Sequence, residues 1–310
     1  MLPLKDDFLL AIKTNNYSPE TLYNYERDLS VFENFLKQEM KTSFDRVTKH
    51  TLERYKAYLV SLDRKTAGGT RAPNKLSAAS VNRILSGLRS YLKYLVEIDH
   101  KIPVAPEAIR LLKMPRVHPR VAEFEALVEL IESPERFEKN KRIALRNRMM
   151  LEILFATGMR ISELLALNRD QINNTGKIFI RGKGKKERFV YLTDRAKKLL
   201  KEYLATRHDI NPALFVPYRG KNIGKDKVRI SPNYLQMKIK RYKEYLGIIV
   251  PTSAHSLRHG FATYLAEQGA NPAAIQILLG HESLQTTTRY VHASDKYAEK
   301  THKRFHPLKE

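Results

Sequence analysis

Hydrophobic residues recur at three- and four-residue steps through the first third of the chain, which is the spacing of one face of an α-helix. Ser18 and Pro19 provide a start signal, with serine as the cap and proline at the first helical position. The spacing predicts three buried helical faces: Leu22, Tyr25, Leu29, Phe32 and Leu36; Leu52, Tyr55, Leu59 and Leu62; and, from a start near Ser77, Val81, Leu85, Leu88, Leu92 and Leu95. An all-α helical bundle is therefore expected here.

The rest of the chain combines helical patterns with one pair of short β-prone runs. Residues 178–181 and 189–192 bracket Gly-Lys-Gly-Lys-Lys, which predicts a hairpin with a basic tip. Further helices are predicted over 124–131, 144–155, 195–204, 232–246 and 256–268. The expected fold class is mainly α with a small β-sheet: an all-α N-terminal bundle and an α+β second domain.

Two domains are expected, because 310 residues exceed the usual size of one domain. The stretch KMPRVHPRV interrupts the helical pattern with two prolines and a cluster of bases, which is typical of a linker. We therefore predict an N-terminal domain over 1–112, a linker over 113–121 and a C-terminal domain over 122–310.

The charge of the chain indicates a polyanionic partner. Its 56 Lys and Arg residues outnumber 33 Asp and Glu residues, which gives a net charge of +23, and most of the excess lies beyond residue 115. Nucleic acid is favoured over an anionic membrane, because the bases are scattered and form no amphipathic stripe. The row Arg83, Ser86, Arg89 and Lys93 is either a solvated helix face or one that contacts phosphates.

A cytoplasmic location is expected. The chain holds no apolar run near the ~18 residues of a membrane span, and acids stand near its start where a signal peptide would be basic. Cysteine is absent, which excludes disulfides and thiolate metal sites and suits a reducing compartment.

Two arginines suggest a phosphate site. Arg160 begins an apolar helical run and Arg258 lies far along the chain in HSLRH. Two guanidiniums can clamp the non-bridging oxygens of one phosphate, and Glu163 is placed to hold Arg160. Taken alone, Arg160, Arg258 and Glu163 could each be an ordinary surface or helix-capping residue.

The histidines allow a second interpretation. His255 and His259 are four residues apart, which is compatible with zinc, but Ser256 stands where the HExxH motif has glutamate and no third ligand is suggested nearby. No metal is therefore predicted. His281 at a helix end and Tyr290 would each, alone, be packing residues.

Taken together, TGMRISELLAL, GKGKKER, HSLRHGFATYLAEQGANPAAIQILLGH and TTTRYVH resemble, in order and spacing, the motifs of the tyrosine site-specific recombinases of the phage integrase family. The resemblance runs from about Asp6 to the HP at 306 and 307 and is greatest to the Xer type. Six residues fall on the family's catalytic positions: Arg160, Lys183, His255, Arg258, His281 and Tyr290.

The resemblance implies a SAM-like, DNA-binding N-terminal domain, a catalytic domain and a tail that docks on a neighbouring protomer. Tyr290 would be the nucleophile and Lys183 the acid, with Lys185 and Lys186 as rivals for the acid or as DNA contacts. Glu163 and His259 would support the site, and no cofactor is implied. The expected partner is double-stranded DNA at a specific site, bound by a homo-tetramer on paired sites.

Other functions remain open at this point. A transposon- or phage-type integrase shares the motifs, a type IB topoisomerase shares the chemistry, and a non-catalytic DNA-binding regulator could share the fold. The sequence does not reveal the target site, a second recombinase or an accessory activator.

Overall fold

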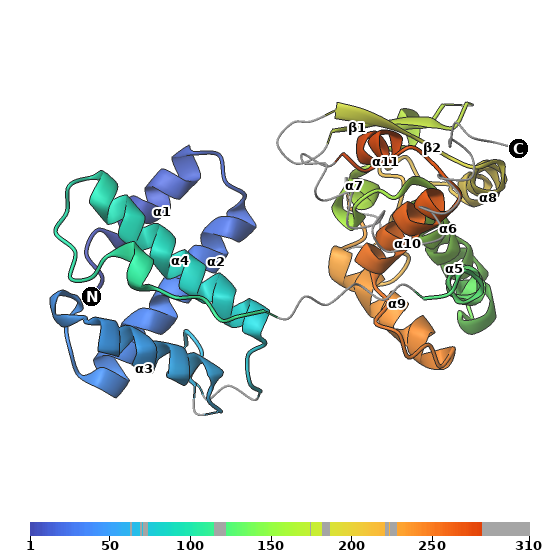
Figure 1. The fold of residues 1–310 in the computed structure, drawn as a ribbon. Helices are drawn as coiled ribbons and strands as arrows, with labels where there is room; N and C mark the ends of the chain where they lie inside the picture. The colour runs from blue at the N-terminus through green and yellow to red at the C-terminus, as the bar shows by residue number, and fades with distance from the viewer. Residues whose placement is uncertain are drawn as a thin grey trace, which may run out of the picture. The chain divides into compact units, whose positions relative to one another are not determined.

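The chain divides into two compact units, Met1–Val117 and His118–Glu310, each with its own hydrophobic core (Figure 1). The computed structural model describes residues 1–62, 64–68, 70, 74–114, 122–173, 175–181, 187–220, 223 and 228–280. Most of the predicted linker, and the predicted tail, lie outside these residues. The linker at 113–121 stays a prediction.

The first unit is helical. Its helices are α1 (Lys5–Thr14), α2 (Pro19–Asn34), which continues into the π-helical η1 (Phe35–Met40), α3 (Lys49–Val60) and α4 (Ala78–Glu97), with short 3-10 turns η2 (Phe44–Arg46) and η3 (Pro106–Ala108). The side chains of Ser18, Thr48 and Ser77 accept hydrogen bonds from backbone N–H groups in the first turns of α2, α3 and α4.

The predicted helix faces are largely confirmed. On the first face Leu29, Phe32 and Leu36 are buried, whereas Leu22 and Tyr25 are half-buried and pack against the same core. All five predicted residues of α4 are buried, and so are Leu52, Tyr55 and Leu59 on α3. Leu62 was predicted beside them and is wrong: α3 ends at Val60, so Leu62 leaves the helical face and is 50% exposed.

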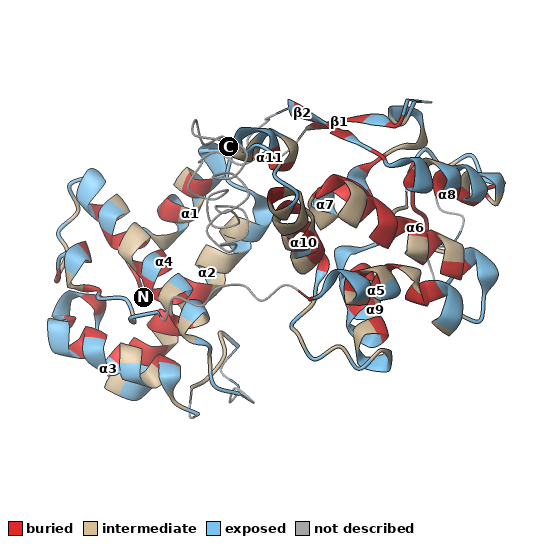
Figure 2. Cartoon of the chain, turned by 45° about the vertical axis from the view of Figure 1, so that its right-hand side comes forward, coloured by how far each residue is buried: buried red, intermediate tan, exposed pale blue. Residues whose placement is uncertain are grey.

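The second unit is built around α6. Its elements are α5 (Phe124–Phe137), α6 (Lys141–Thr157), α7 (Ile161–Ala166), η4 (Arg169–Gln171), β1 (Lys177–Arg181), β2 (Glu187–Tyr191), α8 (Asp194–Ala205), α9 (Pro232–Tyr245), α10 (Ala254–Glu267) and α11 (Pro272–Leu279). Helix α6 is buried along most of its length (Figure 2), and α5, α8 and α10 pack against it. Helices α7 and α10 and strand β2 also contact this central helix, and the candidate site residues lie on or next to these three elements.

Strands β1 and β2 form the predicted hairpin. They pair antiparallel with Ile178 opposite Val190 and Ile180 opposite Arg188. The side chains of Ile178, Ile180, Arg188 and Val190 are buried, whereas Phe179 and Phe189 on the other face are exposed. One face of the hairpin therefore packs on the unit and the other meets solvent.

The expected fold class is confirmed: the chain is mainly α, with an all-α first unit and a small two-stranded sheet in the second. Over the residues that the structure describes, no helix is both long and apolar enough to cross a membrane.

Candidate active site

The turn between α6 and α7 packs directly on α10. Gly158 ends α6 with φ of 61°, a left-handed conformation that favours glycine. A Cβ atom at Gly158 would lie 2.4 Å from the ring of Phe261 on α10. The close approach fixes the start of α7, where Arg160 is the N-cap residue.

Arg258 ties this turn to the end of α11. Its side chain is buried, and its Nη1 and Nη2 donate to the carbonyl oxygens of Gly158 at 2.8 Å and Leu279 at 2.7 Å. Because these partners are neutral, the charge of the guanidinium is not cancelled by them. These two hydrogen bonds fix the positively charged side chain of Arg258 between α10, the α6–α7 turn and the end of α11.

Glu163 is the buried carboxylate of the site. It accepts hydrogen bonds from the backbone N–H of Arg160 at 2.8 Å and from its Nη1 at 2.9 Å. Two further bonds come from Arg188 on β2, at 3.0 and 2.7 Å. Burial pushes the pKa of Glu163 up, but the bonds from Arg188 and Arg160 outweigh burial and lower the pKa to about 2. Glu163 is therefore ionised at neutral pH.

His255 and His259 meet edge to face on α10, with ring centroids 4.2 Å apart. Burial and then the charges of Arg258 and Arg160 lower the pKa of His255 below its usual value. Burial, His255 and Arg258 lower the pKa of His259 to about 4. Both imidazoles are therefore neutral at pH 7, and a neutral imidazole can accept a proton.

The described part of the site is suited to an anion. The guanidiniums of Arg160 and Arg188 bond one carboxylate, Glu163, and that of Arg258 bonds the carbonyl of Gly158, two residues before Arg160. The side chain of Arg160 remains 38% exposed, so a ligand can reach it. This arrangement can hold a phosphate and stabilise added negative charge on it.

The structure brings together five residues that the sequence predicted for the site: Arg160, Glu163, His255, Arg258 and His259. The other five predicted residues, namely Lys183, Lys185, Lys186, His281 and Tyr290, lie outside the described residues. In the sequence, β1 and β2 flank the three lysines and His281 comes directly after Gly280, whereas Tyr290 is ten residues beyond Gly280.

Arg188 was not predicted as a site residue. It is the last residue of the motif GKGKKER, and an arginine in a hairpin is usually exposed. Strand alternation gave the available signal, because Arg188 is two residues from the buried Val190 and so shares its face.

The predicted DNA contacts of the first unit have intramolecular partners. Arg83 on α4 forms a two-pronged pair with Asp28, and Arg89 donates to the carbonyl of Ile109. Lys93 is exposed. Their role as phosphate contacts stays a prediction.

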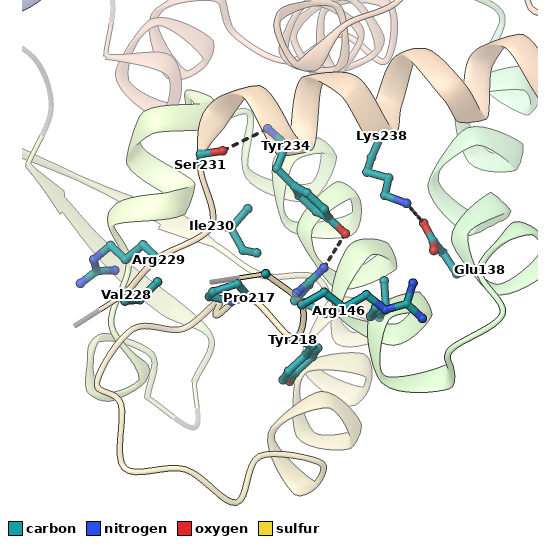
Figure 3. Close-up of a pocket in the computed structure, with 13 residues that line it drawn as sticks. Glu138, Arg146, Pro217, Tyr218, Val228, Arg229, Ile230, Ser231, Tyr234 and Lys238 are labelled. Atoms are coloured by element: carbon teal, nitrogen blue, oxygen red, sulfur yellow. Dashed lines mark hydrogen bonds and ion pairs between the residues drawn. The ribbon is translucent and has the colours of Figure 1, made fainter. Parts of the chain in front are cut away.

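A cavity of about 310 Å³ in the second unit lies apart from these residues (Figure 3). The Arg146 guanidinium at its wall donates to the Val216 carbonyl at 2.7 Å and to the Tyr234 hydroxyl, while Lys238 pairs with Glu138. Arg146 therefore ties α6 to α9, and Lys238 ties α9 to the end of α5. Among the described residues, no group of His, Asp and Glu is placed to bind a metal ion.

Family comparisons agree with this fold. Residues 120–297 match the phage integrase family, and residues 6–98 match the phage integrase N-terminal SAM-like domain. The chain therefore belongs to the phage integrase family.

Individual relatives narrow the class further. The chain is 32% identical to the tyrosine recombinase XerC of Chlamydia caviae, over 97% of this chain and 96% of the relative. At this level of likeness the chain is a tyrosine recombinase of the Xer type.

Solved structures share the fold. A XerH recombinase bound to a palindromic difH substrate, in a post-cleavage complex, has a TM-score of 0.70 and 24% identity over 93% of this chain and 81% of that one. A lambda integrase tetramer bound to a Holliday junction has a TM-score of 0.70 and 16% identity over 94% and 76%.

We predict that Gly158→Ala lowers the free energy of unfolding by about 2 kcal/mol or more, because alanine adds left-handed strain and a clash with Phe261. Gly247→Ala is the matched control: its φ is 66° but a Cβ meets nothing within 4 Å, so it should lose only about 1 kcal/mol. Equilibrium unfolding in denaturant measures both losses. Equal losses would contradict the close packing at Gly158.

We predict that Glu163 contributes stability that depends on pH. Its folded pKa of about 2 lies below the ordinary 4.5, so this stability is present above about pH 4.5 and is lost as pH falls towards 2. Glu163→Gln should lower the free energy of unfolding by about 2 kcal/mol at pH 7, and the gap to the wild type should shrink below pH 4.5. Unfolding curves from pH 3 to 7 measure the gap. The exposed Glu202→Gln is the control, and a gap independent of pH would refute the assignment.

Proposed function

We propose that the chain is a site-specific DNA recombinase that cuts and rejoins strands through a 3′-phosphotyrosyl intermediate on Tyr290. The observation that carries the proposal is the anion site in which Arg160 and Arg258 are held around neutral His255. Motif order then supplies Tyr290, His281 and Lys183 from segments adjoining that site.

In the cleavage step, the hydroxyl oxygen of Tyr290 attacks a backbone phosphorus. The new O–P bond forms as the bond from phosphorus to the 5′-oxygen breaks, leaving a 3′-phosphotyrosine and a free 5′-hydroxyl. His255 receives the tyrosine proton, and Lys183 gives a proton to the departing oxygen. Arg160 and Arg258 balance the charge on the five-coordinate transition state, and His281 donates to a non-bridging oxygen.

Rejoining is the same step in reverse, and the nucleophile is the free 5′-hydroxyl of the strand cut in the partner duplex. The phosphotyrosyl bond keeps the energy of the broken phosphodiester, so the reaction needs no ATP. The arginines perform the charge stabilisation that a metal ion would otherwise supply, so no metal is required.

Double-stranded DNA is the proposed partner. The net charge of +23 favours phosphate contacts, to which Arg83, Arg89, Lys93, Lys185 and Lys186 would contribute. Strand exchange joins two duplexes, so a homo-tetramer on paired sites is proposed, linked by the tail after Tyr290. The lambda integrase tetramer on a Holliday junction supports this assembly by likeness of fold.

The proposed biological role is the resolution of chromosome or plasmid dimers in the cytoplasm, because the relatives matched over most of the chain include XerC and XerD recombinases. Sequencing of DNA trapped covalently on the protein in its own cells would test this role. Trapped sites in a mobile element would instead favour a transposon- or phage-type integrase.

We predict that Tyr290→Phe binds target DNA like the wild type but forms no covalent adduct, because it lacks the nucleophilic oxygen. A nicked suicide substrate and a denaturing gel measure the adduct, and a gel shift measures binding. Wild-type adduct formation should persist in EDTA. Undiminished adduct in the variant would refute Tyr290, and loss in EDTA with rescue by zinc would revive the histidine–metal interpretation.

We predict that a 5′-bridging phosphorothiolate substrate restores cleavage by Lys183→Ala. Sulfur leaves without help from an acid, so the substrate bypasses the proton that Lys183 would supply. Arg160→Ala should gain little, because it loses charge stabilisation instead. Single-turnover cleavage of the two substrates is the measurement. Rescue of Lys185→Ala or Lys186→Ala but not Lys183→Ala would show that the acid is a different lysine.

A further inference from the structure

Arg188 occupies an unusual place for an arginine. It is the second residue of β2, directly after the segment that holds Lys183, and it faces inward with Ile178, Ile180 and Val190. Its side chain is only 5% exposed. A cation on the inner face of a hairpin pays a desolvation penalty that an apolar residue would avoid.

The contacts of Arg188 reach two other elements of the site. Its Nη1 and Nη2 donate to the two oxygens of Glu163, the same oxygens that hold Arg160. Its Nε donates to the carbonyl of Leu278, near the end of α11, at 2.8 Å. One side chain thus joins the hairpin base, the start of α7 and the end of α11.

The end of α11 is shaped to admit this side chain. Gly280 has φ of 63°, and a Cβ there would lie 3.0 Å from Cδ and 3.2 Å from Nη1 of Arg188. The arginine therefore lies against the last described residue before His281. Arg188 therefore lies next to the starts or ends of two segments with proposed catalytic residues: the hairpin segment of Lys183 and the segment that begins at His281.

Stability alone does not account for this arrangement. A buried ion pair is often no more stabilising than apolar residues of similar volume, but three directed hydrogen bonds fix orientation in a way that apolar contacts do not. Catalysis depends on placing the reacting groups within fractions of an ångström. Directed hydrogen bonds between separate segments would therefore help to bring their side chains to one phosphate.

We propose that Arg188 is a positioning residue for the recombination reaction, which sets the base of the Lys183 hairpin and the end of α11 relative to Arg160 through Glu163. It touches no reacting atom. The inference rests on the proposed function, because that proposal assigns Lys183 as the acid. It adds Arg188 as the residue that would fix the position of Lys183 relative to Arg160.

The test uses the full-length chain with Arg188→Lys. Lysine keeps the positive charge beside Glu163 but loses the two-pronged pair and the Nε–H bond to Leu278. Arg207→Lys is the matched control: Arg207 is also buried, donates to the Ala213 and Leu214 carbonyls and pairs with Asp209. Within the part of the chain that the structure describes, it bonds to none of the site residues. Both variants are compared with the wild type in gel shift and in single-turnover cleavage of the ordinary and 5′-phosphorothiolate substrates.

We expect Arg188→Lys to bind DNA within about twofold of the wild type and to cleave the ordinary substrate roughly 10- to 100-fold more slowly. The phosphorothiolate should recover most of that loss, because it removes the need for a well-placed acid. Rates are corrected for the active fraction from the end-point of each reaction. Arg207→Lys should lose active fraction only, with the same corrected rates as the wild type on both substrates.

Two results would overturn the inference: wild-type rates in Arg188→Lys, or an equal slowing on both substrates. If Arg188→Lys fails to fold, Arg188→Gln is used instead: it loses the two-pronged pair but leaves the Arg160–Glu163 contact in place, and the same selective rescue is expected. Absence of any Tyr290 adduct in the wild type would instead refute the proposed function. The two failures are therefore distinguishable.

Discussion

The carboxylate of Glu163 is the interaction on which the rest of the site depends. Its two oxygens accept four hydrogen bonds, two from Arg160 and two from Arg188, so it fixes the first turn of α7 and the inner face of β2 together. Without this negative charge, two guanidiniums would face each other in a buried place and repel. The low pKa of Glu163 has the same origin, because a protonated carboxyl group would lose part of its hydrogen bonding to Arg188 and Arg160.

Arg258 is held differently, and the difference has a chemical consequence. Backbone carbonyls of Gly158 and Leu279 orient it without cancelling its charge. The site therefore keeps a positive excess in a buried setting, where a fixed charge acts more strongly than in water. In the proposed reaction, an incoming phosphate would meet donors that are already oriented, so little reorganisation would be needed as negative charge builds up on it.

Much of the fold could be predicted because its signals are local. The caps Ser18 and Ser77 and the buried face of α4 follow from neighbouring residues, whereas Leu62 was misplaced because periodicity continued past the end of the helix. The Arg160–Glu163 pair follows from a spacing of three residues. The second partner, Arg188, is 25 residues away, and only the packing of β2 against α7 brings it to the carboxylate.

The neutral histidines complete the electrostatic logic of the proposed reaction. Burial, and then the charges of Arg258 and Arg160, lower the pKa of His255, and His259 beside it adds no negative charge that would raise it. A bound phosphate supplies that negative charge and offsets the arginines, which raises the affinity of His255 for a proton. In this scheme His255 becomes an effective acceptor for the tyrosine proton only when a phosphate occupies the site. The arginines proposed to stabilise the transition state would thereby also limit activation of the nucleophile in the absence of DNA.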